Sequence, residues 1–130
     1  MVNPRARSAA GGFTLIELMV VLAAIGLLLA IAAPRYVRHV DEAREVALRQ
    51  DLRQVRLALD QFKADQSRYP ATLEELVSRR YLREVPVDPV TGRADTWRFD
   101  GPPEGEAAGV ADLHSGAPGL AQDGSHYASW

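Results

Sequence analysis

The chain has 130 residues, a formal net charge of −2 and no cysteine. This length allows one small domain on a long helix and leaves no room for two independent cores. The mild acidity argues against a general electrostatic attraction to nucleic acid, and the lack of cysteine excludes disulfides, thiol chemistry and cysteine–zinc sites.

The first predicted element is a membrane-spanning helix over residues 13–33. This stretch is apolar apart from Glu17, and at about 1.5 Å per residue it reaches roughly 30 Å, the thickness of a hydrocarbon core. Residues 1–12 carry Arg5 and Arg7 and no acid. Because positively charged flanks stay in the cytoplasm, we expect the C-terminal end of the helix to point outward.

Glu17 is the one ionisable group in this apolar stretch. A charge at membrane depth costs about 2.5–3.5 kcal/mol on insertion scales, and such residues commonly mark functional sites. A cut between Gly12 and Phe13 would create a largely cationic α-amino group close to Glu17 in sequence. A neighbouring subunit could offer its own terminal ammonium to Glu17, which makes assembly the predicted role of this acid. The alternative is a plain signal anchor that tolerates a glutamate.

Residues 12–17, with the sequence GFTLIE, resemble the class III signal of type IV pilins and of type II secretion pseudopilins. The resemblance implies cleavage after Gly12 by a prepilin peptidase and N-methylation of Phe13. It also implies that Glu17 pairs with the amino terminus of an adjacent subunit during assembly. Pro34 falls where family members often carry a proline that loosens the helix at the end of the membrane segment.

The same resemblance implies how the chain is divided and where it resides. Residues 1–12 would be a cleaved basic leader, residues 13–33 the transmembrane and assembly half of the helix, and residues 34–130 a periplasmic pilin-like domain. The protein would cross the bacterial inner membrane once and then enter a pseudopilus filament. Its expected partners are further copies of itself in a helical filament, other pseudopilins, the inner-membrane secretion platform and the prepilin peptidase. No nucleic acid partner is expected.

Beyond the membrane stretch, apolar residues recur at steps of three and four, which predicts that the helix continues to about residue 64. The acids, Glu45 among them, are expected on the charged face. Arg49, Arg53 and Arg56 each follow an apolar position by one residue, and we expect a solvated flank with ion pairs. A DNA-binding stripe is the alternative, although interleaved acids argue against it. The apolar positions are Val37, Val40, Ala43, Ala47, Leu48, Leu52, Val55, Leu59 and Phe62.

Shorter elements follow the long helix. Thr72 and Glu75 have the spacing of a capping box, which predicts a short helix to about residue 79. Residues 96–99 and 109–113 have strand character and are expected to form a hairpin, with both Trp97 and Phe99 facing the long helix. The fold class is therefore α+β and pilin-like: a long N-terminal helix, half membrane and half soluble, packed against a short helix and a small antiparallel β-sheet.

Two connecting segments resemble one particular type of pseudopilin. Tyr69-Pro70 followed by Leu73 and Leu76, and the irregular residues 81–89, are similar to the corresponding segments of the G-type major pseudopilin of type II secretion.

The C-terminal segment, residues 114–130, is rich in glycine, serine and alanine, yet it carries Tyr127 and Trp130. Aromatic residues at such a position predict that the segment docks on the domain.

Residues 113–116 and 122–125 resemble the C-terminal loop that binds calcium in G-type pseudopilins. The resemblance implies Ca²⁺ held by the Leu113 carbonyl, the Ser115 hydroxyl and the Asp123 carboxylate, which are hard oxygen donors of the kind calcium prefers. The family's loop is usually richer in aspartate. An Asx turn at Asp123 accounts for the same residues without a metal, so both interpretations stay open.

The sequence favours a structural role over catalysis. The three histidines lack metal-ligand spacing, and there is neither a nucleophile-elbow context nor a phosphate-binding glycine loop. The favoured function is a structural subunit of a type II secretion pseudopilus. The alternatives are a major or minor type IV pilin serving adhesion, motility or DNA uptake and, more distantly, an anchored monomeric periplasmic enzyme or binding domain.

Overall fold

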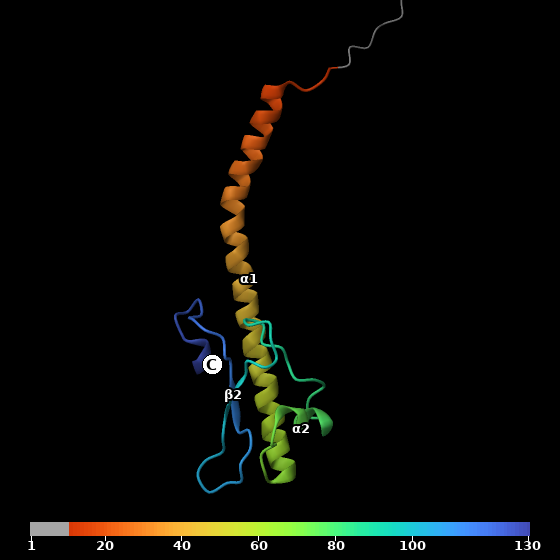
Figure 1. Cartoon of the computed structure of the whole chain (residues 1–130), viewed down its shortest axis with the longest axis vertical. Helices are drawn as coiled ribbons and strands as arrows, with labels where there is room; N and C mark the ends of the chain where they lie inside the picture. The colour runs from red at the N-terminus through yellow and green to blue at the C-terminus, as the bar shows by residue number, and fades with distance from the viewer. Residues whose placement is uncertain (1–10) are drawn as a thin grey trace, which may run out of the picture. The chain divides into compact units, whose positions relative to one another are not determined.

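The computed structural model describes residues 11–130, so the predicted leader residues Arg5 and Arg7 lie outside the described residues. The chain forms two units, of which the first ends at Arg38 and the second is His39–Trp130. The elements are helix α1 (Leu15–Gln66), helix α2 (Leu73–Ser78), strand β1 (Arg98–Asp100), strand β2 (Asp112–His114) and the 3₁₀ helix η1 (Tyr127–Ser129) (Figure 1). The predicted α+β fold class is confirmed.

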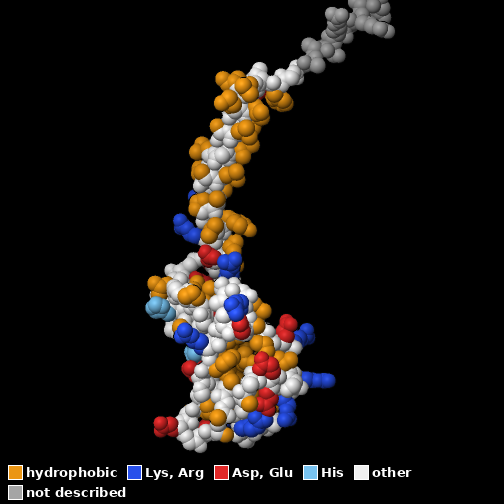
Figure 2. Space-filling model, viewed as in Figure 1, with side chains coloured by type: hydrophobic (Ala, Val, Ile, Leu, Met, Phe, Trp, Pro, Cys, Tyr) orange, Lys and Arg blue, Asp and Glu red, His pale blue; other side chains and the backbone are white. Residues whose placement is uncertain are grey.

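The first unit contains the N-terminal part of α1, whose surface is apolar. Every large apolar side chain between residues 13 and 31 is at least 47% exposed, and Figure 2 shows them as orange side chains along the helix. Among the described residues, α1 is the one helix long and apolar enough to span a membrane. A helix that is apolar on all faces is stable in hydrocarbon or against other apolar surfaces, and not in water.

Pro34 lies inside α1, and the helix continues through it. Proline has no backbone N–H, so the helix lacks one hydrogen bond at this position. The loosening that the sequence suggests at Pro34 stays a prediction.

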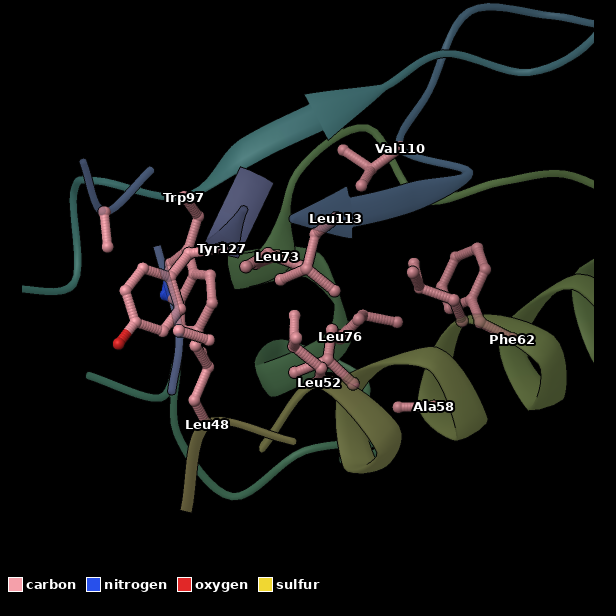
Figure 3. Packing of buried hydrophobic residues seen from close by; sticks show 14 residues of the cluster. Leu48, Leu52, Ala58, Phe62, Leu73, Leu76, Trp97, Val110, Leu113 and Tyr127 are labelled. Atoms are coloured by element: carbon pink, nitrogen blue, oxygen red, sulfur yellow. The ribbon is translucent and has the colours of Figure 1, made fainter. Parts of the chain in front are cut away.

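The core of the second unit forms where one face of α1 meets α2, β2 and the C-terminal segment. Figure 3 shows Leu52 of α1, Leu76 of α2 and Leu113 of β2 packed together. Burying one such side chain contributes about 1.5–3 kcal/mol, so the cluster stabilises the unit. Its buried members are Leu48, Leu52, Val55, Ala58, Leu59, Phe62, Leu73, Leu76, Trp97, Val110, Leu113, Ala117, Ala121 and Tyr127.

The buried face of α1 matches the predicted apolar stripe between Leu48 and Phe62, but the placement of Glu45 on the charged face is wrong. Glu45 is only 5% exposed. Its Oε1 accepts hydrogen bonds from the Gln122 N–H and the Tyr127 hydroxyl, both at 2.9 Å. Burial, followed by this hydrogen bond, raises the pKa of Tyr127. The carboxylate is tolerated because the C-terminal segment supplies its donors.

The two strands form an antiparallel pair in which Arg98 lies opposite His114 and Asp100 opposite Asp112. Trp97 is buried as predicted, and its indole N–H donates to the Pro86 carbonyl at 2.8 Å. The same prediction is wrong for Phe99, which is 51% exposed. Trp97 precedes the first residue of β1, so the two-residue alternation of a strand does not link it to Phe99.

Helix α2 begins as predicted, but its capping chemistry differs. The Thr72 side chain makes no capping hydrogen bond. Glu75 instead accepts from the Ala71 N–H at 2.8 Å and from two guanidinium nitrogens of Arg68, at 2.5 and 3.3 Å. The predicted capping box is therefore wrong in detail, because Arg68 and Ala71 draw the Glu75 carboxylate away from the Thr72 N–H.

The Glu75 contacts predict a pH dependence of stability. The hydrogen bond from Arg68, followed by that from Ala71, lowers the pKa of Glu75 from 4.5 to about 2. A depressed folded-state pKa gives stability that is present above about pH 4.5 and is lost as the pH falls toward 2. We expect Glu75→Gln to be less stable at neutral pH and to lose less stability between those two pH values.

The measurement is thermal unfolding of the full-length chain in detergent at stepped pH. Glu104→Gln, which removes an exposed loop acid, should follow the unmodified protein. If Glu75→Gln loses stability on acidification as steeply as the unmodified protein, the Glu75 contacts do not cause the dependence.

Candidate functional site

The N-terminus of α1 is capped by a reciprocal pair of hydrogen bonds between Thr14 and Glu17. The Glu17 N–H donates to Thr14 Oγ1 at 3.2 Å, and the Thr14 N–H donates to Glu17 Oε2 at 3.5 Å. This is the capping-box arrangement, which satisfies two of the N–H groups left open at a helix start. Sequence reasoning missed it, although residues 14–17 have the Thr-x-x-Glu spacing of a capping box.

The bond between Gly12 and Phe13 is accessible. Residues 11–14 are exposed and belong to no helix or strand, and the Phe13 side chain is 88% exposed. A Cβ built on either Gly11 or Gly12 meets no atom within 4 Å. An enzyme that cuts here therefore finds a peptide bond outside the helix, next to small residues.

The structure brings the predicted processing and assembly residues together. Gly12, Phe13 and Glu17, with Gly11, line a shallow hollow of about 220 Å³. Pro34, the other predicted assembly residue, lies 17 positions further along the same helix, roughly 25 Å away at about 1.5 Å per residue. The site is thus confined to the first turn of α1 and the residues before it.

Glu17 keeps most of its hydrogen-bonding capacity. An ionised carboxylate has about four acceptor positions, and within the described residues one hydrogen bond, from the Thr14 N–H, reaches the Glu17 side chain. The first turn of a helix carries a partial positive charge that favours an anion. The carboxylate is therefore held in place locally and remains open to an external cation.

The oxygens that the resemblance assigns to calcium each have other partners. The Leu113 carbonyl accepts from Arg56 at 3.1 Å, and the Asp123 carboxylate accepts from Arg49 at 3.0 Å. The Ser115 hydroxyl donates to buried Asp88 at 2.5 Å and accepts from a backbone N–H at 3.1 Å. Among residues 11–130, no group of three or more histidine, aspartate or glutamate side chains could hold a metal. This donor set does not fit a calcium site.

Asp123 forms the Asx turn that the sequence suggests at this position. Its Oδ1 accepts from the Ser125 N–H at 2.9 Å and from the Ser125 hydroxyl at 2.5 Å, which is an Asx turn. Docking of the C-terminal segment is also confirmed, because Tyr127 is buried and its ring packs edge-on against Trp130 at a centroid distance of 5.3 Å.

The arginines of α1 are at least partly exposed and two of them form ion pairs, as predicted, but the partner acids lie in the C-terminal part of the same chain. Arg49 and Arg56 reach the C-terminal segment, whereas Arg53 stays exposed and bonds to the Arg49 carbonyl at 3.3 Å. Two of the three cations are thus paired with acids of their own chain, Asp123 and Asp112.

The apolar helix begins with a capping box that contains Glu17, and the exposed Gly12–Phe13 bond precedes it. This arrangement matches a recognised motif. Residues 7–33 match the family model described as the prokaryotic N-terminal methylation motif. The fold and this site define the chain as a pilin-like subunit with a prepilin-type N-terminus.

Comparison with curated proteins identifies the family. The chain is 35% identical over 99 residues to type II secretion system core protein G of Pseudomonas aeruginosa, covering 64% of this chain and 70% of that protein. The protein of the same name from Klebsiella michiganensis is 32% identical over 102 residues (66% and 72%), and that of Escherichia coli is 32% identical over 101 residues (65% and 70%). No solved structure matches the chain. The chain belongs to the family of type II secretion system core protein G, the G-type pseudopilins.

Proposed function

We propose that this chain is a structural subunit of a type II secretion pseudopilus that is cut after Gly12, methylated on Phe13 and assembled through α1. The observation that carries the proposal is Glu17, a carboxylate with spare acceptor positions at the start of an uncovered apolar helix. It lies beside the exposed bond whose cleavage creates a cation. The names of the relatives favour secretion over a type IV pilus.

The chemistry of assembly follows from charge. Hydrolysis of the Gly12–Phe13 amide leaves a carboxylate on the leader and an α-ammonium on Phe13, and N-methylation keeps that nitrogen basic. In the lipid, Glu17 of an isolated subunit has only its local cap to offset desolvation. Pairing with the Phe13 ammonium of the next subunit would stabilise both charges. Apolar side chains between residues 13 and 31 would then pack against those of neighbouring copies.

The same proposal covers location and partners. The subunit would rest in the bacterial inner membrane with its second unit in the periplasm, because the basic residues Arg5 and Arg7 precede the apolar stretch. The partners would be the prepilin peptidase on the cytoplasmic face, further copies of this chain and other pseudopilins. An inner-membrane secretion platform would extract the subunits.

Mass spectrometry of the membrane-extracted protein tests the processing step. In cells with an active prepilin peptidase, we expect a chain that begins at Phe13 and is one methyl group heavier than residues 13–130. Cells without the peptidase should yield a chain that still carries residues 1–12. A chain that keeps its leader in the presence of active peptidase would contradict the proposal.

A further inference from the structure

The chain after β2 returns to α1, where two arginines hold it. Arg56 Nε donates to Asp112 Oδ1 at 2.7 Å, and its Nη2 donates to the backbone carbonyls of Leu113 and Trp130 at 3.1 and 2.9 Å. Arg56 therefore joins three points of the C-terminal part of the chain to one position on the helix.

Arg49 makes a second attachment about two turns earlier on the same helix face. Its Nη2 donates to Asp123 Oδ2 at 3.0 Å, and its guanidinium carbon lies 3.9 Å from the centre of the Trp130 ring. The indole N–H of Trp130 in turn donates to the Ser125 hydroxyl at 2.6 Å. One guanidinium thus contacts both the Asx turn at Asp123 and the aromatic residue that follows it.

These contacts use the oxygens that a G-type calcium loop would offer to the metal. Calcium needs six to eight oxygen ligands, yet the Leu113 carbonyl and the Asp123 carboxylate already face a guanidinium. The Ser115 hydroxyl directs its proton to Asp88, in a separate buried network. A divalent cation placed among these groups would be repelled by Arg49 and Arg56 at close range.

Arginine has the properties that this role requires. Its planar guanidinium carries five donors, stays charged at every pH at which the protein is folded, and stacks on aromatic rings. It can therefore gather carbonyl and carboxylate oxygens from separate segments, as a metal ion does. Charge-assisted hydrogen bonds of this kind are among the strong ones in proteins.

We propose that the C-terminal segment of this chain, residues 114–130, is fixed to α1 by Arg49 and Arg56 in place of calcium. The second unit then reaches its complete fold without the metal. The inference concerns the folding of this unit alone and holds whether or not Glu17 acts in assembly.

The test uses the full-length chain in detergent micelles, with either a calcium chelator or about 5 mM calcium, above the range in which extracellular calcium modules are half-saturated. Two readouts are followed: the unfolding temperature, and chymotrypsin cleavage after Tyr127, which is buried in the docked segment. For the unmodified protein, we expect the same unfolding temperature and the same slow cleavage in both solutions.

Arg56→Gln and Arg53→Gln form a matched pair of variants. Arg53 lies on the same helix and is exposed, and within the described residues its side chain donates to the Arg49 carbonyl of its own helix. We expect Arg56→Gln to lower the unfolding temperature and to speed cleavage after Tyr127 about tenfold, because local opening sets proteolysis. Calcium should not restore protection, and Arg53→Gln should resemble the unmodified protein.

Two results would overturn the proposal. The first is a rise in unfolding temperature, or protection of Tyr127, when calcium is added to the unmodified protein. The second is an Arg56→Gln variant whose segment is as well protected as in Arg53→Gln. If Arg56→Gln does not fold, the calcium comparison on the unmodified protein still decides the question.

Discussion

Replacing Glu17 with alanine is expected to leave the protein in the membrane and to stop filament assembly. Removing the carboxylate also removes its insertion cost of about 2.5–3.5 kcal/mol, so the span should insert at least as well as before. Assembly would lose the partner of each incoming Phe13 ammonium. Removing one partner of a buried ion pair costs about 3–5 kcal/mol, because the other charge is left unpaired. In a filament this loss recurs at every subunit.

A second variant separates the charge of Glu17 from its local role. Glutamine at a capping-box position can still accept the Thr14 N–H, so Glu17→Gln keeps the cap and removes the charge. We expect it to block assembly as completely as Glu17→Ala does. Filaments sheared from cells and membrane fractions, both probed for this chain, provide the measurement. Glu42→Ala removes an exposed acid elsewhere on α1 and should assemble normally.

The two variants distinguish the pairing of Glu17 with a neighbouring Phe13 from its role in the capping box. If both assemble normally, Glu17 has no role in filament formation. If Glu17→Gln assembles and Glu17→Ala does not, the capping box at the start of α1 is the function of this acid, and its pairing with a neighbouring Phe13 is refuted.

Local signals in the sequence predicted the elements well. The uninterrupted apolar stretch, the stripe from Leu48 to Phe62 and the start of α2 each depend on residues within a few positions of one another. A Thr-x-x-Glu spacing was a less reliable guide to capping. It forms a box at residues 14–17, where no other cation or N–H of residues 11–130 competes for Glu17, and fails at residues 72–75, where Arg68 does compete.

Contacts between residues far apart in the sequence determine the features that local patterns did not predict. Glu45 is buried because Gln122 and Tyr127 arrive from the far end of the chain with two donors. Likewise, Arg56 is only partly exposed because it donates to the carbonyls of Leu113 and Trp130. The steps of three and four from Leu48 to Phe62 place position 45 on the buried face as well. No helical periodicity, however, encodes the distant donors that allow a carboxylate to be buried there.

Replacing Gly116 with alanine is expected to lower the stability of the second unit more than a substitution at any exposed position. A Cβ built on Gly116 would lie 1.9 Å from the carbonyl oxygen of Thr96 and 3.0 Å from its carbonyl carbon. These are backbone atoms, so no side-chain rotation relieves the overlap and the two segments must separate. Overpacking of this kind costs about 1–3 kcal/mol, occasionally more, and we expect the upper end here.

Gly101→Ala is the matched control, because a Cβ at Gly101 meets nothing within 4 Å and its φ lies outside the left-handed region. Trp97 and Trp130 are the two tryptophans, and both lie in the second unit, so tryptophan fluorescence follows the unfolding of that unit. A domain of this size shifts its unfolding temperature by about 4–8 °C per kcal/mol. We therefore expect a fall of more than about 10 °C for Gly116→Ala and little change for Gly101→Ala. Equal temperatures for the two variants would rule out the close approach to Thr96.

The position of Gly116 extends this effect to the C-terminal segment. Its neighbours Ser115 and Ala117 are buried, and the Ser115 hydroxyl bonds to Asp88, a fully buried carboxylate. Moving residue 116 away from Thr96 would stretch or break the hydrogen bond from Ser115 to Asp88. The buried carboxylate would then lose one of its donors, which lowers the stability of the folded state. Gly116→Ala should therefore also speed cleavage after Tyr127, although Arg49 and Arg56 are intact. Such a result would show that the docked segment needs both the arginine contacts and the close backbone approach at Gly116.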